Sequence, residues 1–299
     1  MKALPAELAE DGAAFLAAGK DHALAITTSG KLVGWGDKSC GQYGFEPVLN
    51  ALPTPTELAA GIEPQRVASL VCGYQTSALV TKDGRAFVWG NTNIARNLGE
   101  IAALENVGRV AFTASAAIAV RKDGSFTTGR ERIFSAAVSE KTGRISSLDA
   151  YLTERKVQEI ATTNKCVALL LDGGELVVSG VFENGEDELP ALQEGEYFVA
   201  LDGGSRHFVG VTNLGNAYAW GHNAYGQCNV VQDGNAARVF AGALQTYVVD
   251  GEGNITQSIG LKGYLMGTDG RGRDVFARIV HGGKMTMTIG AVAVLVSSV

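Results

Sequence analysis

Residues 77–90, SALVTKDGRAFVWG, place two short apolar runs on either side of a Lys-Asp-Gly turn. Apolar residues that alternate with a period of two predict β-strands, and an Asp-Gly pair between two such runs predicts a tight turn. The stretch is therefore expected to form a β-hairpin that ends at Trp89. Because related hairpins are expected at residues 22–36, 168–180 and 208–221, this pattern decides the fold.

The three tryptophans of the chain mark a repeat. Trp35, Trp89 and Trp220 are each followed by a glycine, and each lies sixteen residues after another glycine. These earlier glycines are Gly19, Gly73 and Gly204, and weaker copies of the frame are anchored at Thr113, Thr163, Gly242 and Gly283. Seven units of about forty residues result, a length typical of the blades of a β-propeller.

We therefore predict an all-β chain in which residues 1–299 form one seven-bladed β-propeller. Each blade of such a ring buries its faces on its neighbours, so the length of the chain is compatible with a single domain. The 39 glycines suit a fold with many tight turns. Insertions interrupt the repeat at about residues 45–66 and 135–156.

The ends of the chain predict how the ring closes. The seventh unit, anchored at Gly283, ends at Val299 and so lacks its outermost strand. We expect residues Lys2 to Glu10 to supply this strand, so that N- and C-terminal strands complete one blade. Closure of this kind removes two exposed sheet edges.

Composition excludes several classes of partner and location. The net charge of −6 and the pI near 5.3 argue against nucleic acid, because phosphate binding needs clustered basic residues. Glu7, Glu10 and Asp11 interrupt any apolar stretch that a signal peptide requires. The apolar residues 285–299 form a stretch shorter than a membrane-spanning helix. We expect no membrane contact, no secretion by a signal peptide, and a cytoplasmic or virion location.

The first and fifth units share the fullest pattern: a glycine, a histidine three residues later, a Trp-Gly pair and a Gly-Gln pair. These are Gly19, His22, Trp35-Gly36 and Gly41-Gln42 in the first unit, and Gly204, His207, Trp220-Gly221 and Gly226-Gln227 in the fifth. The pattern resembles the repeat of the regulator of chromosome condensation family. The resemblance implies a seven-bladed propeller and, from the eukaryotic relatives, nucleotide exchange on a small GTPase. Proteins similar to this family also occur in contractile phage tails and baseplates.

The candidate chemical groups fall at repeat positions. His22 and His207 share one position, and Trp35, Trp89 and Trp220 share another. Repetition around a ring is typical of structural roles, so packing or hydrogen bonding is expected of all five. The four cysteines show no spacing typical of a metal or redox site, and no nucleophile–base pair is evident. We predict no catalytic residue, no metal and no cofactor, while an active site assembled from several blades stays open.

Two features provide candidate partner-binding residues. The first insertion holds four of the six prolines, and its Pro53-Thr54-Pro55 stretch is expected to be extended and stiff, which lowers the entropy cost of docking. The connection between the fourth and fifth units is acidic, and its residues Glu186, Asp187 and Glu188 would bind a basic partner. Variable spacers and a solvated loop are the alternatives.

The sequence favours a non-enzymatic module for protein–protein interaction or structure. A component of a phage tail or baseplate, present in symmetric copies, is one such module. Guanine-nucleotide exchange on a small GTPase is the alternative, although neither insertion identifies a wedge for the switch loops. A hydrolase or lyase in the central funnel is a third reading, for which no paired carboxylates are evident.

Overall fold

The computed structural model describes residues 5–43, 49–59, 61–127 and 136–261, which fold into six antiparallel sheets numbered 1 to 6 along the chain. Their first strands are β1 (Ala13–Ala18), β5 (Val67–Cys72), β8 (Val107–Phe112), β13 (Val157–Thr162), β16 (Phe198–Gly203) and β19 (Arg238–Ala241). Their second strands are β2 (His22–Thr27), β6 (Thr76–Thr81), β9 (Ala117–Arg121), β14 (Cys166–Leu171), β17 (His207–Thr212) and β20 (Gln245–Val249). Their third strands are β3 (Leu32–Gly36), β7 (Ala86–Asn91), β10 (Phe126–Thr127), β15 (Leu176–Gly180), β18 (Ala217–Gly221) and β21 (Ile255–Gly260).

The repeat read from the sequence matches the sheets. Each anchor within the described residues directly follows a first strand, and these anchors are Gly19, Gly73, Thr113, Thr163, Gly204 and Gly242. The predicted hairpin at residues 77–90 forms most of β6 and β7, and its register pairs Ser77 with Trp89. The all-β prediction is confirmed. The seventh unit, anchored at Gly283, lies outside the described residues, as does the C-terminal half of the predicted ring closure.

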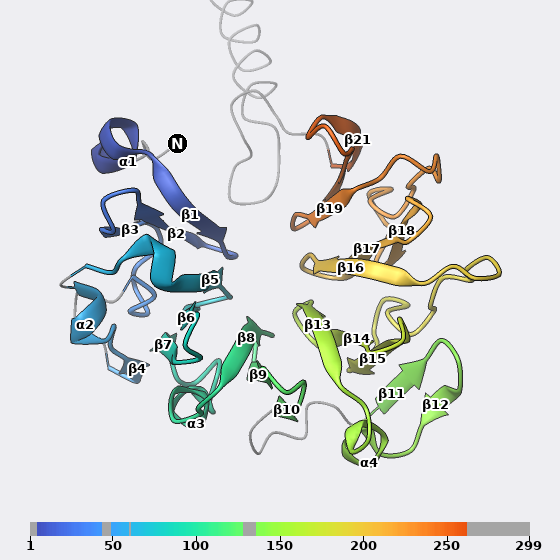
Figure 1. Cartoon of the computed structure of the whole chain (residues 1–299), viewed down its shortest axis with the longest axis horizontal. Coiled ribbons are helices and arrows are strands. Elements are labelled where there is room, and N and C mark those ends of the chain that lie inside the picture. Colours follow the sequence, from blue (N-terminus) through green and yellow to red (C-terminus); the bar gives the residue numbers. More distant parts are fainter. Residues whose placement is uncertain (1–4, 44–48, 60, 128–135, 262–299) are drawn as a thin grey trace, which may run out of the picture. The chain divides into compact units, whose positions relative to one another are not determined.

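The sheets of residues 5–260 pack against one another in chain order. Contacts run between the first strands in the sequence β1, β5, β8, β13, β16 and β19 (Figure 1). Each of the five interfaces between successive sheets holds a cluster of buried apolar side chains. Strand β14 shows how: Val167 and Leu169 belong to the cluster with sheet 3, whereas Ala168 and Leu170 belong to the cluster with sheet 5. Because side chains alternate across a strand, a second strand with apolar residues at every position is buried on both faces.

The Trp-Gly pair has a steric cause. Gly36 has a φ of 103°, a conformation that side chains rarely adopt. A Cβ added at Gly36 would lie 2.5 Å from the carbonyl oxygen of Asp21. That oxygen accepts a 2.7 Å hydrogen bond from the backbone N–H of Asp37. The glycine therefore lets the chain turn out of the third strand while it stays bonded to the start of the second.

Both insertions extend sheets. In the first, β4 (Ala51–Leu52) pairs with the end of β7, and α2 (Thr56–Ala59) and the 3-10 helix η1 (Pro64–Arg66) follow. Strand β4 ends before Pro53, since a proline has no N–H for a ladder of hydrogen bonds. In the second, β11 (Ala136–Ser139) pairs with β15, β12 (Gly143–Ile145) pairs with β11, and α4 (Leu148–Leu152) returns the chain to sheet 4.

The predicted N-terminal strand is wrong where the structure describes it. Residues Ala6–Asp11 form the helix α1, so the part of the predicted strand from Ala6 to Glu10 is helical. Pro5 stands just before the first helical residue, and Ala, Glu and Leu are strong helix formers. Gly12, with a φ of 72°, ends the helix through a bond from its N–H to the carbonyl of Leu8. Local helix propensity therefore decides this segment. Residues 2–4 lie outside the described part.

Candidate functional site

A hydrogen-bond network joins sheet 1 to sheet 2 through His22. Its Nε2 lies 2.9 Å from the hydroxyl of Ser77, which is on β6 of the next sheet. Ser77 donates its single proton to the carbonyl oxygen of Gln42 at 2.8 Å, and Trp89 Nε1 donates to the same oxygen at 2.8 Å. His22 must therefore carry its own proton on Nε2 and donate it to Ser77. The side chains of His22, Ser77 and Trp89 and the backbone carbonyl of Gln42 thus serve one interface.

The same network joins sheet 5 to sheet 6. His207 Nε2 lies 3.0 Å from Thr246 Oγ1, and Thr246 donates to the carbonyl of Gln227 at 2.8 Å. His207 is therefore also protonated on Nε2. Trp220 differs from Trp89, because its buried Nε1 has no hydrogen-bond partner among the described residues. Trp35 is half-buried.

In the described sheets, each histidine that starts a second strand is paired with a Ser or Thr hydroxyl on the second strand of the next sheet. At the interface between sheets 4 and 5, Cys166 replaces the histidine, Phe208 replaces the hydroxyl residue, and both belong to one apolar cluster. Between sheets 2 and 3, the side chain of Asn97 bonds the N–H and the carbonyl of Ala117 at 2.9 and 2.8 Å. The interfaces between sheets 1 and 2 and between sheets 5 and 6 therefore share one pairing, whereas the interfaces between sheets 2 and 3 and between sheets 4 and 5 use different ones.

Burial sets the protonation of both histidines. It lowers the pKa of His22 to about 4, against the opposing effect of Asp37. It lowers the pKa of His207 to about 4 as well, with a hydrogen bond at Gln245 acting against it and His222 adding to it. The Nδ1 atoms of both rings are buried and lack a partner among the described residues. A second proton would therefore be unsatisfied, and both rings are neutral at pH 7.

The predicted partner-binding prolines line a groove. Pro53 and Pro55 border a groove of about 720 Å³, together with Phe87 of β7 and Leu104 after the helix α3 (Leu98–Ala102). The guanidinium of Arg85 lies 4.8 Å from the ring centroid of Phe87. Apolar side chains with a few polar groups at the edge are typical of a binding site. Sequence reasoning found the prolines and missed the opposite wall, which comes from a different repeat unit.

The three acidic candidates separate in the structure. Glu186 is only 2% exposed, and its carboxylate accepts the N–H groups of Glu183 and Asn184 at 3.0 and 2.7 Å. The Glu186 carboxylate is therefore bonded within its own loop, which leaves it little surface for contact with a partner. Asp187 and Glu188 are exposed, and their role in binding stays a prediction. The sequence contains a sign of this structural role, because Gly185-Glu186 stands at the repeat position of the Gly-Gln pairs Gly41-Gln42 and Gly226-Gln227.

The loop bonds confirm this equivalence. Gln42 accepts the N–H of Cys40 on Oε1 at 2.8 Å, and Gln227 accepts the N–H of Tyr225 at 3.0 Å. Glu186 accepts the N–H of Asn184 in the same way, two residues earlier in the chain.

A second buried carboxylate lies before sheet 5. Glu196 accepts hydrogen bonds from Thr212, Asn216 and Tyr218 at 2.6 to 2.9 Å. Burial raises its pKa, but these bonds and one from the N–H of Gln193 outweigh burial and bring the pKa to about 2. Burial and the bond to Glu196 raise the pKa of Tyr218 to about 12. Glu196 therefore stays ionised and organises the loop.

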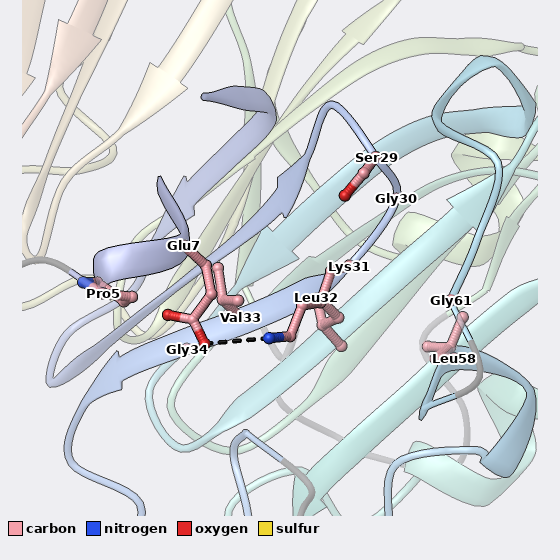
Figure 2. A pocket seen from close by; sticks show the side chains of 10 residues that line it. All are labelled: Pro5, Glu7, Ser29, Gly30, Lys31, Leu32, Val33, Gly34, Leu58 and Gly61. Carbon is pink, nitrogen blue, oxygen red and sulfur yellow. Dashed lines mark hydrogen bonds and ion pairs between the residues drawn. The ribbon is translucent and has the colours of Figure 1, made fainter. Parts of the chain in front are cut away.

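A smaller pocket of about 410 Å³ borders the outer strand of sheet 1. Figure 2 shows Pro5 and Glu7 on one side, Leu32 on β3, and Leu58 on the other side. Lys31 Nζ lies 3.1 Å from a carboxylate oxygen of Glu7. Because both side chains are about half exposed, this ion pair adds little stability.

The described residues hold no group of three or more His, Cys, Asp or Glu side chains placed to bind a metal ion. Within the same residues, no helix has the length and apolar character needed to span a membrane.

Comparison with known proteins agrees with the repeat. The model of the Regulator of chromosome condensation (RCC1) repeat matches residues 14–42, 67–93 and 198–227. These segments hold strands of sheets 1, 2 and 5, and each includes one of the three tryptophans.

Relatives and solved structures extend the likeness along the chain. The X-linked retinitis pigmentosa GTPase regulator homolog of Caenorhabditis elegans is 26% identical over 244 residues, which cover 75% of this chain and 17% of that protein. The ultraviolet-B receptor UVR8 of Arabidopsis thaliana is 22% identical over 265 residues, covering 79% of this chain and 58% of that protein. Yeast RCC1, solved bound to Kap60, has a TM-score of 0.58 and 16% identity, with 82% of this chain and 69% of that chain covered.

The chain spans less than two thirds of the length of these curated relatives. The likeness to yeast RCC1 concerns the fold, and it agrees with sheets that pack face to face in chain order. Three matched repeats in register with the sheets, and relatives that cover most of the chain, show that the chain contains repeats of the regulator of chromosome condensation (RCC1) type.

Proposed function

We propose that this protein is a non-enzymatic protein-interaction module that binds its partner in the groove beside Pro53 and Pro55. The observation that carries the proposal is the groove of about 720 Å³ between the first insertion and the segment after α3. Yeast RCC1, whose fold is similar, was solved bound to another protein.

The walls of the groove define the partner's chemistry. Pro53, Phe87, Ala103 and Leu104 present apolar surface. Prolines are stiff, so little conformational entropy is lost when a partner docks against them. Asp83, Arg85 and Glu105 add charges of both signs. An apolar segment of a partner protein with polar flanks fits such walls.

Site-specific photo-cross-linking tests the proposal. A photoreactive phenylalanine analogue replaces exposed Ala103, and a matched variant carries it at exposed Val231, outside the groove. We expect a partner protein to cross-link at position 103 and not at 231, and Pro53→Glu to abolish the product. Equal products at both positions would contradict the groove.

A GTPase regulator is the second candidate, favoured by the name of the Caenorhabditis elegans relative. Under this alternative the chain would accelerate nucleotide release from a small GTPase. A release assay with a panel of small GTPases decides between the two, because acceleration would replace the first proposal. A role in a phage tail or baseplate, with symmetric copies, stays a prediction that analysis of purified virions tests.

We also infer that a seventh repeat unit begins near Gly283. Leu16 on β1 is 66% exposed, although its counterparts Val110 and Leu201 are 4% and 8% exposed. An apolar face of this kind needs a further apolar neighbour. Deletion of residues 262–299 should lower the melting temperature by many degrees, and an unchanged melting temperature would remove the inference.

A further inference from the structure

The turns that follow the first strands meet around a hollow of about 270 Å³, which we call the axial hollow. Residues from all six sheets line it, including Gly19, Gly73, Thr163, Gly204 and Gly242. Each of these is a repeat anchor. The residues directly after the anchors add side chains to the rim, among them Lys20, Tyr74, Asn164 and Ser205.

Close backbone contacts hold these turns in place. A Cβ at Gly19 would collide with the carbonyl oxygen of Gly73, and one at Gly204 would collide with that of Gly242. Lys20 donates its N–H to the carbonyl of Gly73 at 3.2 Å. The glycines therefore allow adjacent sheets to touch, and the rim is preorganised.

Polar side chains converge on the rim from different sheets. The ammonium of Lys20 lies 4.4 Å from the ring centroid of Tyr74, which belongs to the next sheet. Burial raises the pKa of Tyr74, whereas Arg206 and a hydrogen bond with Asn164 act against this and Asp21 adds to it. Tyr74 therefore contacts Lys20 of the neighbouring sheet at the rim.

The charges of the rim favour an anion. Lys20 and Arg206 have no ion-pair partner among the described residues, whereas Lys165 is bound to Glu183 at 2.5 Å. Lys20 is the charged residue that lines the hollow, and Arg206 directly follows the lining residue Ser205, while Asp21 directly follows Lys20. The volume suits one side chain with its carboxylate, and the basic surface is too small for a nucleic-acid backbone.

We propose that the axial hollow binds a carboxylate side chain from an acidic segment of a partner protein. Lys20 and Arg206 supply charge, and Tyr74 and Ser205 supply hydroxyl donors. The proposal rests on the protein-interaction function and names a second contact for it, separate from the groove beside Pro53.

The probe is a fluorescently labelled, terminally blocked hexaglutamate peptide, titrated at low salt into the full chain while anisotropy is recorded. We expect saturable binding that Lys20→Ala with Arg206→Ala weakens about tenfold, the loss of two charge contacts of about 0.7 kcal/mol each. Ser205→Asp should weaken it similarly by repulsion. The matched control, Lys82→Ala with Lys122→Ala, removes the same charge at the hairpin turns and should change the affinity less than about twofold.

Several results would overturn the proposal. Equal losses in both double variants would mean general electrostatic attraction, and equal binding of a hexaglutamine peptide would exclude carboxylate recognition. Displacement by inorganic phosphate at the peptide's own concentration would mean a site for free anions. Cross-linking at position 103 remains a separate readout, so failure here is distinguishable from failure of the interaction function.

Discussion

Acidification to pH 5 should destabilise the protein through His22 and His207. Their pKa is about 4 in the folded protein and about 6.5 when the chain is unfolded. Between these values the unfolded chain binds protons that the folded chain does not, so the free energy of unfolding falls as pH decreases. At pH 5 the loss is about 2 kcal/mol for each histidine, or about 4 kcal/mol for both. This is a large part of the 5–15 kcal/mol typical of folded domains.

Urea unfolding at pH 7.5, 6.5, 5.5 and 5.0 measures this loss. The matched variant is His22→Gln with His207→Gln, because the glutamine amide can still donate to Ser77 and Thr246 but does not titrate. We expect the double variant to be less stable than the wild type at pH 7.5 and to lose much less stability between pH 6.5 and 5.0. If both proteins lose the same free energy of unfolding over this range, the assignment of buried, neutral histidines is wrong.

Three further predictions concern single side chains. Glu196→Gln should lower the free energy of unfolding at pH 7 by about 1–3 kcal/mol. The pKa of Glu196 is about 2 in the folded protein and 4.5 when the chain is unfolded, so the wild type should lose this advantage as the pH falls from 4.5 to 2. Urea titrations at those pH values check this loss. Gly36→Ala should cost about 2 kcal/mol or more, whereas the helical control Gly99→Ala, with open space around it, should be neutral or stabilising by up to about 1 kcal/mol in thermal melts. Ser77→Ala should cost about 1–3 kcal/mol, because it leaves the Nε2–H of His22 buried without an acceptor; a chemical-denaturation difference below 0.5 kcal/mol would contradict that network.

Local repeats made most of the fold predictable. Strand periodicity and the Trp-Gly pairs gave correct anchors even at Thr113 and Thr163, where the pattern is weak. In these units the threonine hydroxyl accepts the N–H three residues later, a bond that the glycine units lack. The N-terminal strand failed because local helix propensity in Ala6–Asp11 outweighed the expected need for an edge strand.

The candidate site was less predictable because it depends on contacts between repeat units. The sequence singled out Pro53 and Pro55 but could not place Leu104 on the facing wall. It ranked Glu186 with exposed acids, whereas hydrogen bonds within its own loop bury it. The pairing of His22 with Ser77 likewise joins positions 55 apart in the chain, so no local pattern reveals it.

Hydrogen–deuterium exchange of the partner-bound chain tests the central claim most directly. With the partner captured by cross-linking at position 103, we predict slower amide exchange in residues 83–88 and 102–106, which line the groove beside Pro53, and unchanged exchange at the turn of residues 213–216. Protection confined to other segments, with the complex intact, would contradict a protein-interaction function carried by this groove.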